Sequence, residues 1–234
     1  MMRPIVAAIV ASYLLGSIPA AYVAGNARGI DLRKHGSGNL GATNVMRVLG
    51  TKIGLLVFAF DMAKGAVPVL FFPNVVAAGA MPLGSRTIMA ILCGIAAIIG
   101  HVRPIYLKLG RGGKGVATAA GVFLALAPVQ TLLTLVIFAV VLLASGYVSL
   151  GSLTSALMLP ALLAITVGVR SPVFGISVCV AAFVFWTHRA NIARLRDGEE
   201  HRFGKRGVQA KRPAVTMAIA LAIVAATLIA ARFA

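Results

Sequence analysis

The chain has 234 residues, of which 60% are hydrophobic and only 12% are charged. A soluble domain carries about 25% charged residues, so this composition, with a mean hydropathy of +0.98, excludes an ordinary soluble domain. Lys and Arg number 22 against 5 Asp and Glu, for a formal net charge of +17. On a soluble protein that charge would indicate nucleic acid, but the apolar residues come in long blocks. We therefore expect a membrane protein with no nucleic-acid partner.

The apolar blocks predict eight helical spans, because lipid offers the backbone no hydrogen-bond partners outside its own helix. The first block continues to Val23, too far for a cleaved signal peptide, so we expect a retained span there. Pro128 interrupts the helical ladder and should split the long run at 115–145 into a short and a longer helix. The expected spans are 4–25, 53–72, 86–107, 115–127, 129–145, 149–168, 172–187 and 213–232.

Basic residues gather in three loops between these blocks. Five lie between Asn26 and Lys52, four between His101 and Lys114, and eight between His188 and Arg212. Cytoplasmic loops of membrane proteins are rich in Lys and Arg, so all three loops should face the cytoplasm, with the N-terminus outside. Topology alone would explain most of this charge.

Each basic loop contains a segment of polar residues that could bind an anion. The first polar segment, residues 35–47, reads HGSGNLGATNVMR. Glycines allow backbone amides to converge in nests that bind anions, and the segment adds hydroxyl, amide and guanidinium donors. The alternative is a flexible turn between two spans. The candidate residues are Ser37, Asn39, Thr43, Asn44 and Arg47.

The second polar segment, residues 110–118, reads GRGGKGVAT and leads into an apolar helix. A glycine-rich turn at a helix N-terminus favours an anion through its free amides and the helix dipole. Neither this segment nor the first follows a strand, so their G-x-G-x-x-G spacing is not a dinucleotide fingerprint. The alternative is a basic anchor at the membrane surface. The candidates are Arg111, Gly112, Gly113, Lys114, Gly115 and Thr118.

The third polar segment, residues 188–200, places His188, Asn191 and Arg194 three residues apart. On a helix these side chains share one sector of the surface, where Arg can hold a phosphate and His and Asn can bind a hydroxyl. We expect Gly198 to end the helix, and Glu199 is a candidate contact to substrate or to an arginine. The alternative is a charged helix extension at the membrane interface.

The sequence contains no G-x-S-x-G elbow, H-E-x-x-H pair or cysteine ligand set, and Cys93 and Cys179 lie inside apolar blocks. We therefore expect no metal and no cofactor. A site built from amides, hydroxyls and cations suits the stabilisation of phosphate charge.

The three segments, in this order, resemble the bacterial acyl-phosphate:glycerol-3-phosphate acyltransferase family. The resemblance rests on Gly36–Asn44 with Arg47, on Gly112–Thr118 and on His188–Glu199, with lesser features at 61–65 (DMAKG) and 147–152 (YVSLGS). Two departures are Arg103, where an aromatic residue is expected, and one additional residue between His101 and Lys114.

The resemblance implies an all-α, polytopic bundle of seven transmembrane helices, some short or broken, in the bacterial inner membrane with the site facing the cytoplasm. The span at 213–232 is additional, within a single integral membrane domain over residues 1–234. The implied reaction transfers a fatty acyl group from acyl phosphate to the sn-1 hydroxyl of glycerol 3-phosphate. It gives lysophosphatidic acid and phosphate, the first acylation step of phospholipid synthesis.

We assign His188, Lys114 and Ser37 as catalytic residues. The proton acceptor is either His188 or a substrate phosphate. The remaining candidates, including Ser149 from the lesser motif, are assigned to substrate binding: Asn39, Thr43, Asn44, Arg47, Arg111, Gly112, Gly113, Gly115, Thr118, Ser149, Asn191, Arg194 and Glu199. The rival function is a small-anion transporter, but such proteins often show internal repeats and polar residues at the midplane, which are not evident here.

Overall fold

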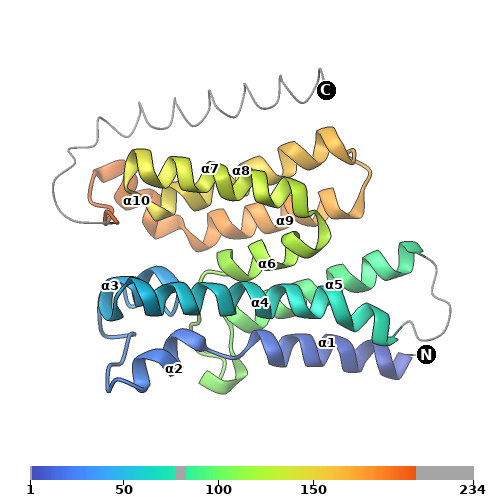
Figure 1. Ribbon diagram of the computed structural model, residues 1–234, viewed down its shortest axis with the longest axis horizontal. Coiled ribbons are helices and arrows are strands. Elements are labelled where there is room, and N and C mark those ends of the chain that lie inside the picture. Colours follow the sequence, from blue (N-terminus) through green and yellow to red (C-terminus); the bar gives the residue numbers. More distant parts are fainter. Residues whose placement is uncertain (1, 77–82, 204–234) are drawn as a thin grey trace. The chain divides into compact units, whose positions relative to one another are not determined.

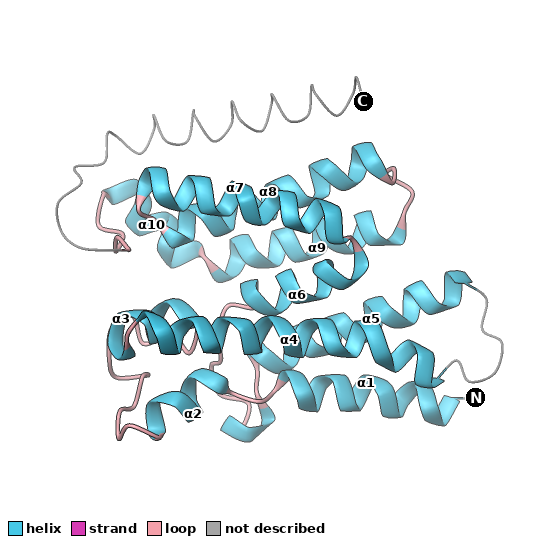
Figure 2. Cartoon of the chain, viewed as in Figure 1, coloured by secondary structure: helices cyan, strands magenta, loops and turns pink. Residues whose placement is uncertain are grey.

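The computed structural model describes residues 2–76 and 83–203, and every regular element within them is a helix (Figure 2). The expected span at 213–232 lies outside these residues. The chain divides into two compact units, one ending at Leu126 and the other beginning at Ala127, and each is described by itself. The expectation of a single domain over the whole chain stays a prediction.

The described part of the first unit, residues 2–76 and 83–126, contains six α-helices and one 3-10 turn. Figure 1 shows how the labelled helices follow one another. Their bounds are α1 Met2–Gly16, α2 Ala20–Asn26, α3 Ala42–Leu49, α4 Thr51–Val76, α5 Leu83–Val102, η1 Ile105–Leu107 and α6 Val116–Leu126. The described part of the second unit contains α7 Pro128–Ser145, α8 Val148–Thr166, α9 Pro172–Thr187 and α10 Arg189–Asp197.

Five stretches in the described residues are long and apolar enough to cross a membrane, and α9 with α10 makes a sixth if this pair, bent by 58°, counts as one span. The protein is therefore an all-helical, multi-pass membrane protein. Helix α6 has 11 residues and is about 16 Å long at 1.5 Å per residue, about half of a 30 Å hydrocarbon core. The five stretches are Arg3–Asn26, Thr51–Asn74, Ser85–Leu107, Pro128–Ser145 and Val148–Thr166.

Prolines set two of the helix boundaries. Pro128 occupies the first turn of α7 after a non-helical Ala127, where its missing N–H costs nothing, and this confirms the predicted split of the run at 115–145. The first span, expected over 4–25, agrees with the candidate span Arg3–Asn26, but its helix is broken between Gly16 and Ala20. Pro19 lacks an N–H and disfavours helical geometry at Ile18, which explains the break.

Glycines let the helices of the first unit approach one another closely, as in many membrane bundles. A Cβ at Gly65 of α4 would overlap the carbonyl oxygen of Thr118 in α6, and one at Gly121 of α6 would overlap the carbonyl oxygen of Met62. A Cβ at Gly16 would likewise overlap the backbone of Ala97 in α5. Helix α4 thus packs directly against α6, with backbone touching backbone.

In the second unit α7 and α8 pack together, and α8 packs on α9. A buried apolar cluster joins α7 to α8, and Leu195 of α10 packs against it. Large apolar side chains such as Leu143, which is 85% exposed, cover the outer surfaces of the helices. Lipid would cover these side chains in a membrane. The cluster consists of Ile137, Val141, Tyr147, Leu150, Met158 and Leu162.

Candidate active site

Asn44 organises the first polar segment from the first turn of α3. Its Oδ1 accepts a hydrogen bond from the backbone amide of Ser37 (2.8 Å), and its Nδ2 donates to the carbonyl oxygens of Leu32 (3.2 Å) and His35 (3.0 Å). Gly36 has a φ of +61°, and a Cβ there would overlap Asn44 Oδ1. The buried Asn44 amide, expected to bind substrate, thus holds the loop that carries Ser37.

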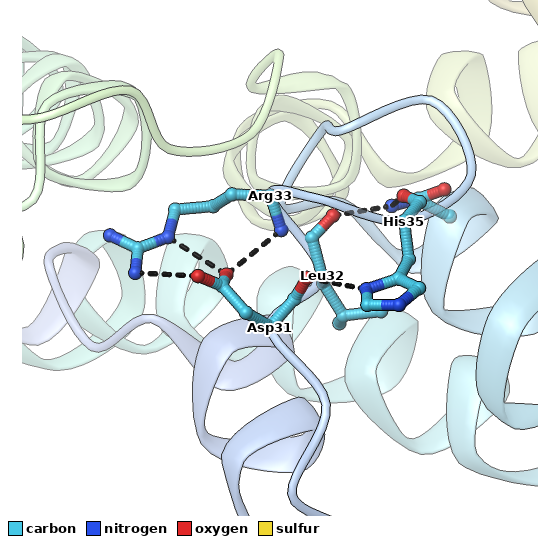
Figure 3. A network of polar contacts seen from close by, with 5 residues as sticks. Asp31, Leu32, Arg33 and His35 are labelled. Atoms are coloured by element: carbon cyan, nitrogen blue, oxygen red, sulfur yellow. Dashed lines mark hydrogen bonds and ion pairs between the residues drawn. The ribbon is translucent and has the colours of Figure 1, made fainter.

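Asp31 fixes the start of the same loop (Figure 3). The Arg33 guanidinium donates to both carboxylate oxygens at 2.9 Å, and His35 Nδ1 donates to the Asp31 carbonyl oxygen at 2.9 Å. The hydrogen bond from the Arg33 side chain lowers the pKa of Asp31 to about 2, and the same bond raises the pKa of Arg33. Because the carboxyl pKa is depressed, the pair persists above a pH of about 4 and is lost only as the pH falls through 2.

The Arg33 guanidinium is thus occupied by the Asp31 carboxylate. Its Cζ also lies 5.3 Å from the centroid of the Tyr22 ring. Arg47, by contrast, lies exposed on α3, while Asn39 and Thr43 are half-buried near the N-terminus of that helix. The first segment therefore offers the Ser37 hydroxyl and the Arg47 guanidinium to a ligand.

The second polar segment is a tight loop between η1 and α6. Gly112 donates its amide to the Val102 carbonyl oxygen at 3.0 Å. Gly112 and Gly113 are buried, Arg111 is exposed and Lys114 is half-buried. A Cβ at Gly113 would stand 3.1 Å from the Leu40 carbonyl oxygen. The fold of the first unit therefore brings the first and second polar segments into contact, as a shared site requires.

Gly115, with a φ of +84°, turns the chain into α6, and Thr118 lies in the first turn. The Thr118 hydroxyl is fully buried and has no hydrogen-bond partner among the described residues. Ser149, in the first turn of α8 in the second unit, also has a buried hydroxyl without a hydrogen-bond partner among the described residues. An unsatisfied buried hydroxyl costs about 1–3 kcal/mol, so a substrate oxygen would find a donor at either predicted residue.

His188 lies at the bend between α9 and α10 and is buried. Its Nδ1 lies 2.8 Å from the carbonyl oxygen of Val184. A carbonyl oxygen only accepts, so Nδ1 carries the hydrogen of the neutral ring and Nε2 carries the lone pair. Nε2 is therefore the nitrogen of His188 that can accept a proton.

Asn191 and Arg194 are joined on α10 by the carboxylate of Glu200. Asn191 Nδ2 donates to Glu200 Oε1 at 2.6 Å, and Arg194 Nε donates to Glu200 Oε2 at 2.7 Å. The structure thus brings these two candidates together, and Gly198 ends the helix with a φ of +76°, as expected. Glu199 is exposed and donates its amide to the Arg194 carbonyl oxygen.

The sequence reasoning singled out Glu199 and missed Glu200. The two glutamates are adjacent in the sequence, and only the contacts with Asn191 and Arg194 distinguish Glu200. Arg202 was missed as well. It lies over the Tyr147 ring at 5.4 Å and donates to the Tyr147 hydroxyl at 3.2 Å, holding the segment after α10 on the turn before Ser149.

The fold and these segments define a class: a multi-pass helical membrane protein whose glycine-rich loops and cations suit phosphate groups. The family model described as glycerol-3-phosphate acyltransferase matches residues 6–198. The chain belongs to this family.

Curated relatives with that name are similar over most of the chain. The one from Geobacter metallireducens is 46% identical, with 82% of this chain and 94% of the relative covered. The one from Chlorobaculum tepidum is 40% identical, with coverages of 88% and 100%.

A crystal structure of PlsY, an integral membrane glycerol 3-phosphate acyltransferase in its glycerol 3-phosphate form, matches with a TM-score of 0.77 and 38% identity. It covers 86% of this chain and 96% of PlsY. The lysophosphatidic acid form matches with a TM-score of 0.75 and 36% identity, over 86% and 95% of the two chains.

The two neighbouring glutamates offer a matched pair of variants. Glu200→Gln should lower the melting temperature of the purified protein in detergent, because it removes the charge that partners Arg194 in a site where Glu200 is 7% exposed. Charge-assisted hydrogen bonds contribute about 1.5–3 kcal/mol. Glu199→Gln changes an exposed side chain and should leave the free energy of unfolding within about 0.5 kcal/mol of wild type, with little change in melting temperature. Equal effects of the two changes would contradict the role given to Glu200.

Proposed function

We propose that this protein transfers a fatty acyl group from acyl phosphate to the sn-1 hydroxyl of glycerol 3-phosphate. The observation that carries the proposal is the match to PlsY in its glycerol 3-phosphate form, at 38% identity over 86% of the chain. The hydroxyl oxygen attacks the acyl carbonyl carbon, an ester bond forms, and the bond between that carbon and the phosphate oxygen breaks. The products are lysophosphatidic acid and inorganic phosphate.

The chemistry of the donor explains why the polar segments carry cations and amides. Acyl phosphate is a mixed anhydride whose leaving group is already stable, so the reaction needs little help from an acid. Both substrates bear phosphate groups that repel one another, and positive charge must offset this repulsion. We assign that role to Arg47, Lys114 and Arg194, together with the amides of the second segment. Holding the substrates in attack geometry then lowers the barrier further, by about 7–11 kcal/mol at best.

We propose that His188 receives the proton of the attacking hydroxyl. The hydrogen bond between Nδ1 and the Val184 carbonyl oxygen supports this role, because it fixes the tautomer in which Nε2 is basic. The Ser37 amide, held by Asn44, supports a second assignment, in which the Ser37 hydroxyl hydrogen-bonds substrate. The unpartnered hydroxyls of Thr118 and Ser149 are assigned to substrate oxygens.

The protein is proposed to reside in the bacterial inner membrane with seven spans and with its three polar segments facing the cytoplasm. The basic residues of those loops support this orientation, and α6 counts as a short span. The site would then meet cytoplasmic glycerol 3-phosphate while the acyl chain lies among the helices.

The donor is tested with purified protein in detergent and labelled glycerol 3-phosphate. Labelled lysophosphatidic acid should form with acyl phosphate and should not form with acyl-CoA or acyl carrier protein. The physical reason is that the second polar segment brings Arg111 and Lys114 to a glycine-rich turn before a helix N-terminus, which favours a phosphate group. Turnover with acyl-CoA in reagents free of acyl phosphate would contradict the proposed donor.

The role of His188 is tested by His188→Gln, which keeps a hydrogen-bonding side chain but removes the base. kcat should fall by about 10²–10⁴-fold, the usual contribution of a general base, while KM for both substrates changes little. The neighbouring exposed His201→Gln is the control and should retain wild-type kinetics. A change confined to KM would instead assign the proton to a substrate phosphate.

Membrane orientation is tested by thiol labelling of intact cells, in a background in which Cys93 and Cys179 are replaced by Ala. A maleimide that cannot cross the membrane should modify Val169→Cys, which replaces an exposed residue in the turn between α8 and α9. It should not modify Arg111→Cys or Arg189→Cys until the cells are opened. Labelling of Arg111→Cys from outside would overturn the proposed orientation.

A further inference from the structure

Three buried titratable side chains of the first unit take no part in the reaction as described so far. Asp61 and Lys64 lie on α4 and are 2% and 3% exposed, and His101 lies near the end of α5 and is 6% exposed. Asp61 Oδ1 is 2.7 Å from Lys64 Nζ and 3.5 Å from His101 Nδ1. We call these three residues the buried triad.

A buried ion pair is weak evidence for stability, because apolar residues of similar size often serve as well or better. Asp61 lies about 15 Å along α4 from Thr51 at 1.5 Å per residue, well inside the span Thr51–Asn74. Ionisable residues at such positions are expensive and usually serve function. The buried triad therefore calls for a role beyond holding helices together.

The imidazole of His101 lies directly against the second polar segment. A Cβ at Gly113 would overlap His101 Nε2, and a Cβ at Gly112 would overlap the His101 carbonyl oxygen. The amide of Gly112 is also bonded to the next carbonyl oxygen, that of Val102. One face of the glycine-rich loop thus rests on His101, whose other nitrogen faces Asp61.

The same stretch of α4 also holds the far end of that loop. Gly65, next to Lys64, touches the Thr118 carbonyl oxygen in the first turn of α6, and Met62, next to Asp61, touches Gly121. Lys64 Nζ further donates to the Ile18 carbonyl oxygen at 2.9 Å, in the break before Pro19. Residues 61–65 therefore hold both ends of the second polar segment: its start through His101 and its end through α6.

We propose that the buried triad positions the second polar segment for acyl transfer: Asp61, paired with Lys64, orients the His101 ring, and the ring sets the backbone of Gly112–Lys114. These are positioning residues, since none of them need touch substrate. The inference rests on the proposed function, because it concerns the placement of phosphate-binding amides for that reaction. A displacement of about 1 Å in such a loop can cost about 100-fold in rate.

The test compares His101→Leu with His101→Gln in the purified full-length protein. Leu fills the space but cannot bond to Asp61, whereas Gln retains a side-chain donor. Asp61→Asn, with Lys64→Met in the same chain, removes the charge pair without leaving a lone buried charge. Ser12→Ala, at another buried polar position of the first unit, is the matched control.

We expect kcat/KM to fall about 10- to 100-fold for His101→Leu and for the Asp61→Asn, Lys64→Met double variant. His101→Gln should recover at least a third of the wild-type value, and Ser12→Ala should keep it. The melting temperature is measured alongside, so that losses are compared only among variants folded at the assay temperature. The rise in melting temperature caused by glycerol 3-phosphate or by inorganic phosphate should shrink in the variants with lowered kcat/KM.

A second comparison probes the contact itself. Gly113→Ala should inactivate the wild-type protein, because the new methyl group overlaps the His101 ring. In a His101→Ala background only the close approach to the Leu40 carbonyl oxygen, at 3.1 Å, remains, so adding Gly113→Ala should cost much less than the same change costs in the wild-type protein.

The inference would be overturned if His101→Leu kept the wild-type kcat/KM. It would also be overturned if Gly113→Ala lowered kcat/KM by the same factor in the His101→Ala background as in the wild-type protein. Either result would leave the proposed function standing. Failure of the wild-type protein itself to acylate glycerol 3-phosphate would instead remove the proposed function.

Discussion

The close approach of α4, α5 and α6 at glycine residues is the constraint on which the first unit depends. Where Gly65 and Gly121 meet backbone carbonyls, no larger residue fits without moving a helix. This contact places the start of the short helix α6 against the middle of α4. The loop before α6 must then lie over the end of α5, where Gly112 and Gly113 allow the chain to pass against His101. The polar loop is thus positioned by helix packing rather than by its own sequence.

Several polar side chains in both units bind other protein groups, and this limits which donors are left for the proposed substrates. Asn44 and Arg33 are occupied by the first loop, and Glu200 links Asn191 to Arg194. Such a supporting set keeps the remaining donors in place before substrate arrives, which lowers the cost of binding. The family match over residues 6–198 includes most of this set, but not Glu200.

Much of the fold could be predicted from the sequence, because apolar blocks and Pro128 mark helices that lipid requires. The break at Pro19 was missed because apolar residues continue on both sides of it, so the block was interpreted as one helix despite Ser17 and Pro19. The sequence predicted the three polar segments of the candidate site, but not which of their residues contact one another. Asn44 was expected to bind substrate. In the structure it bonds to the loop that carries Ser37, and these bonds form only because that glycine-containing loop folds back onto α3. The pairing of Asp61 with His101 joins positions 40 residues apart, and no local spacing reveals it.

In the proposed reaction, acyl transfer and phosphate release occur together. Phosphorus NMR of acyl phosphate and glycerol 3-phosphate with the purified protein follows both products directly. The signals of inorganic phosphate and of lysophosphatidic acid should grow at equal rates, and neither should grow when glycerol 3-phosphate is left out. Phosphate release at an undiminished rate without glycerol 3-phosphate, or no lysophosphatidic acid at all, would contradict the proposed reaction.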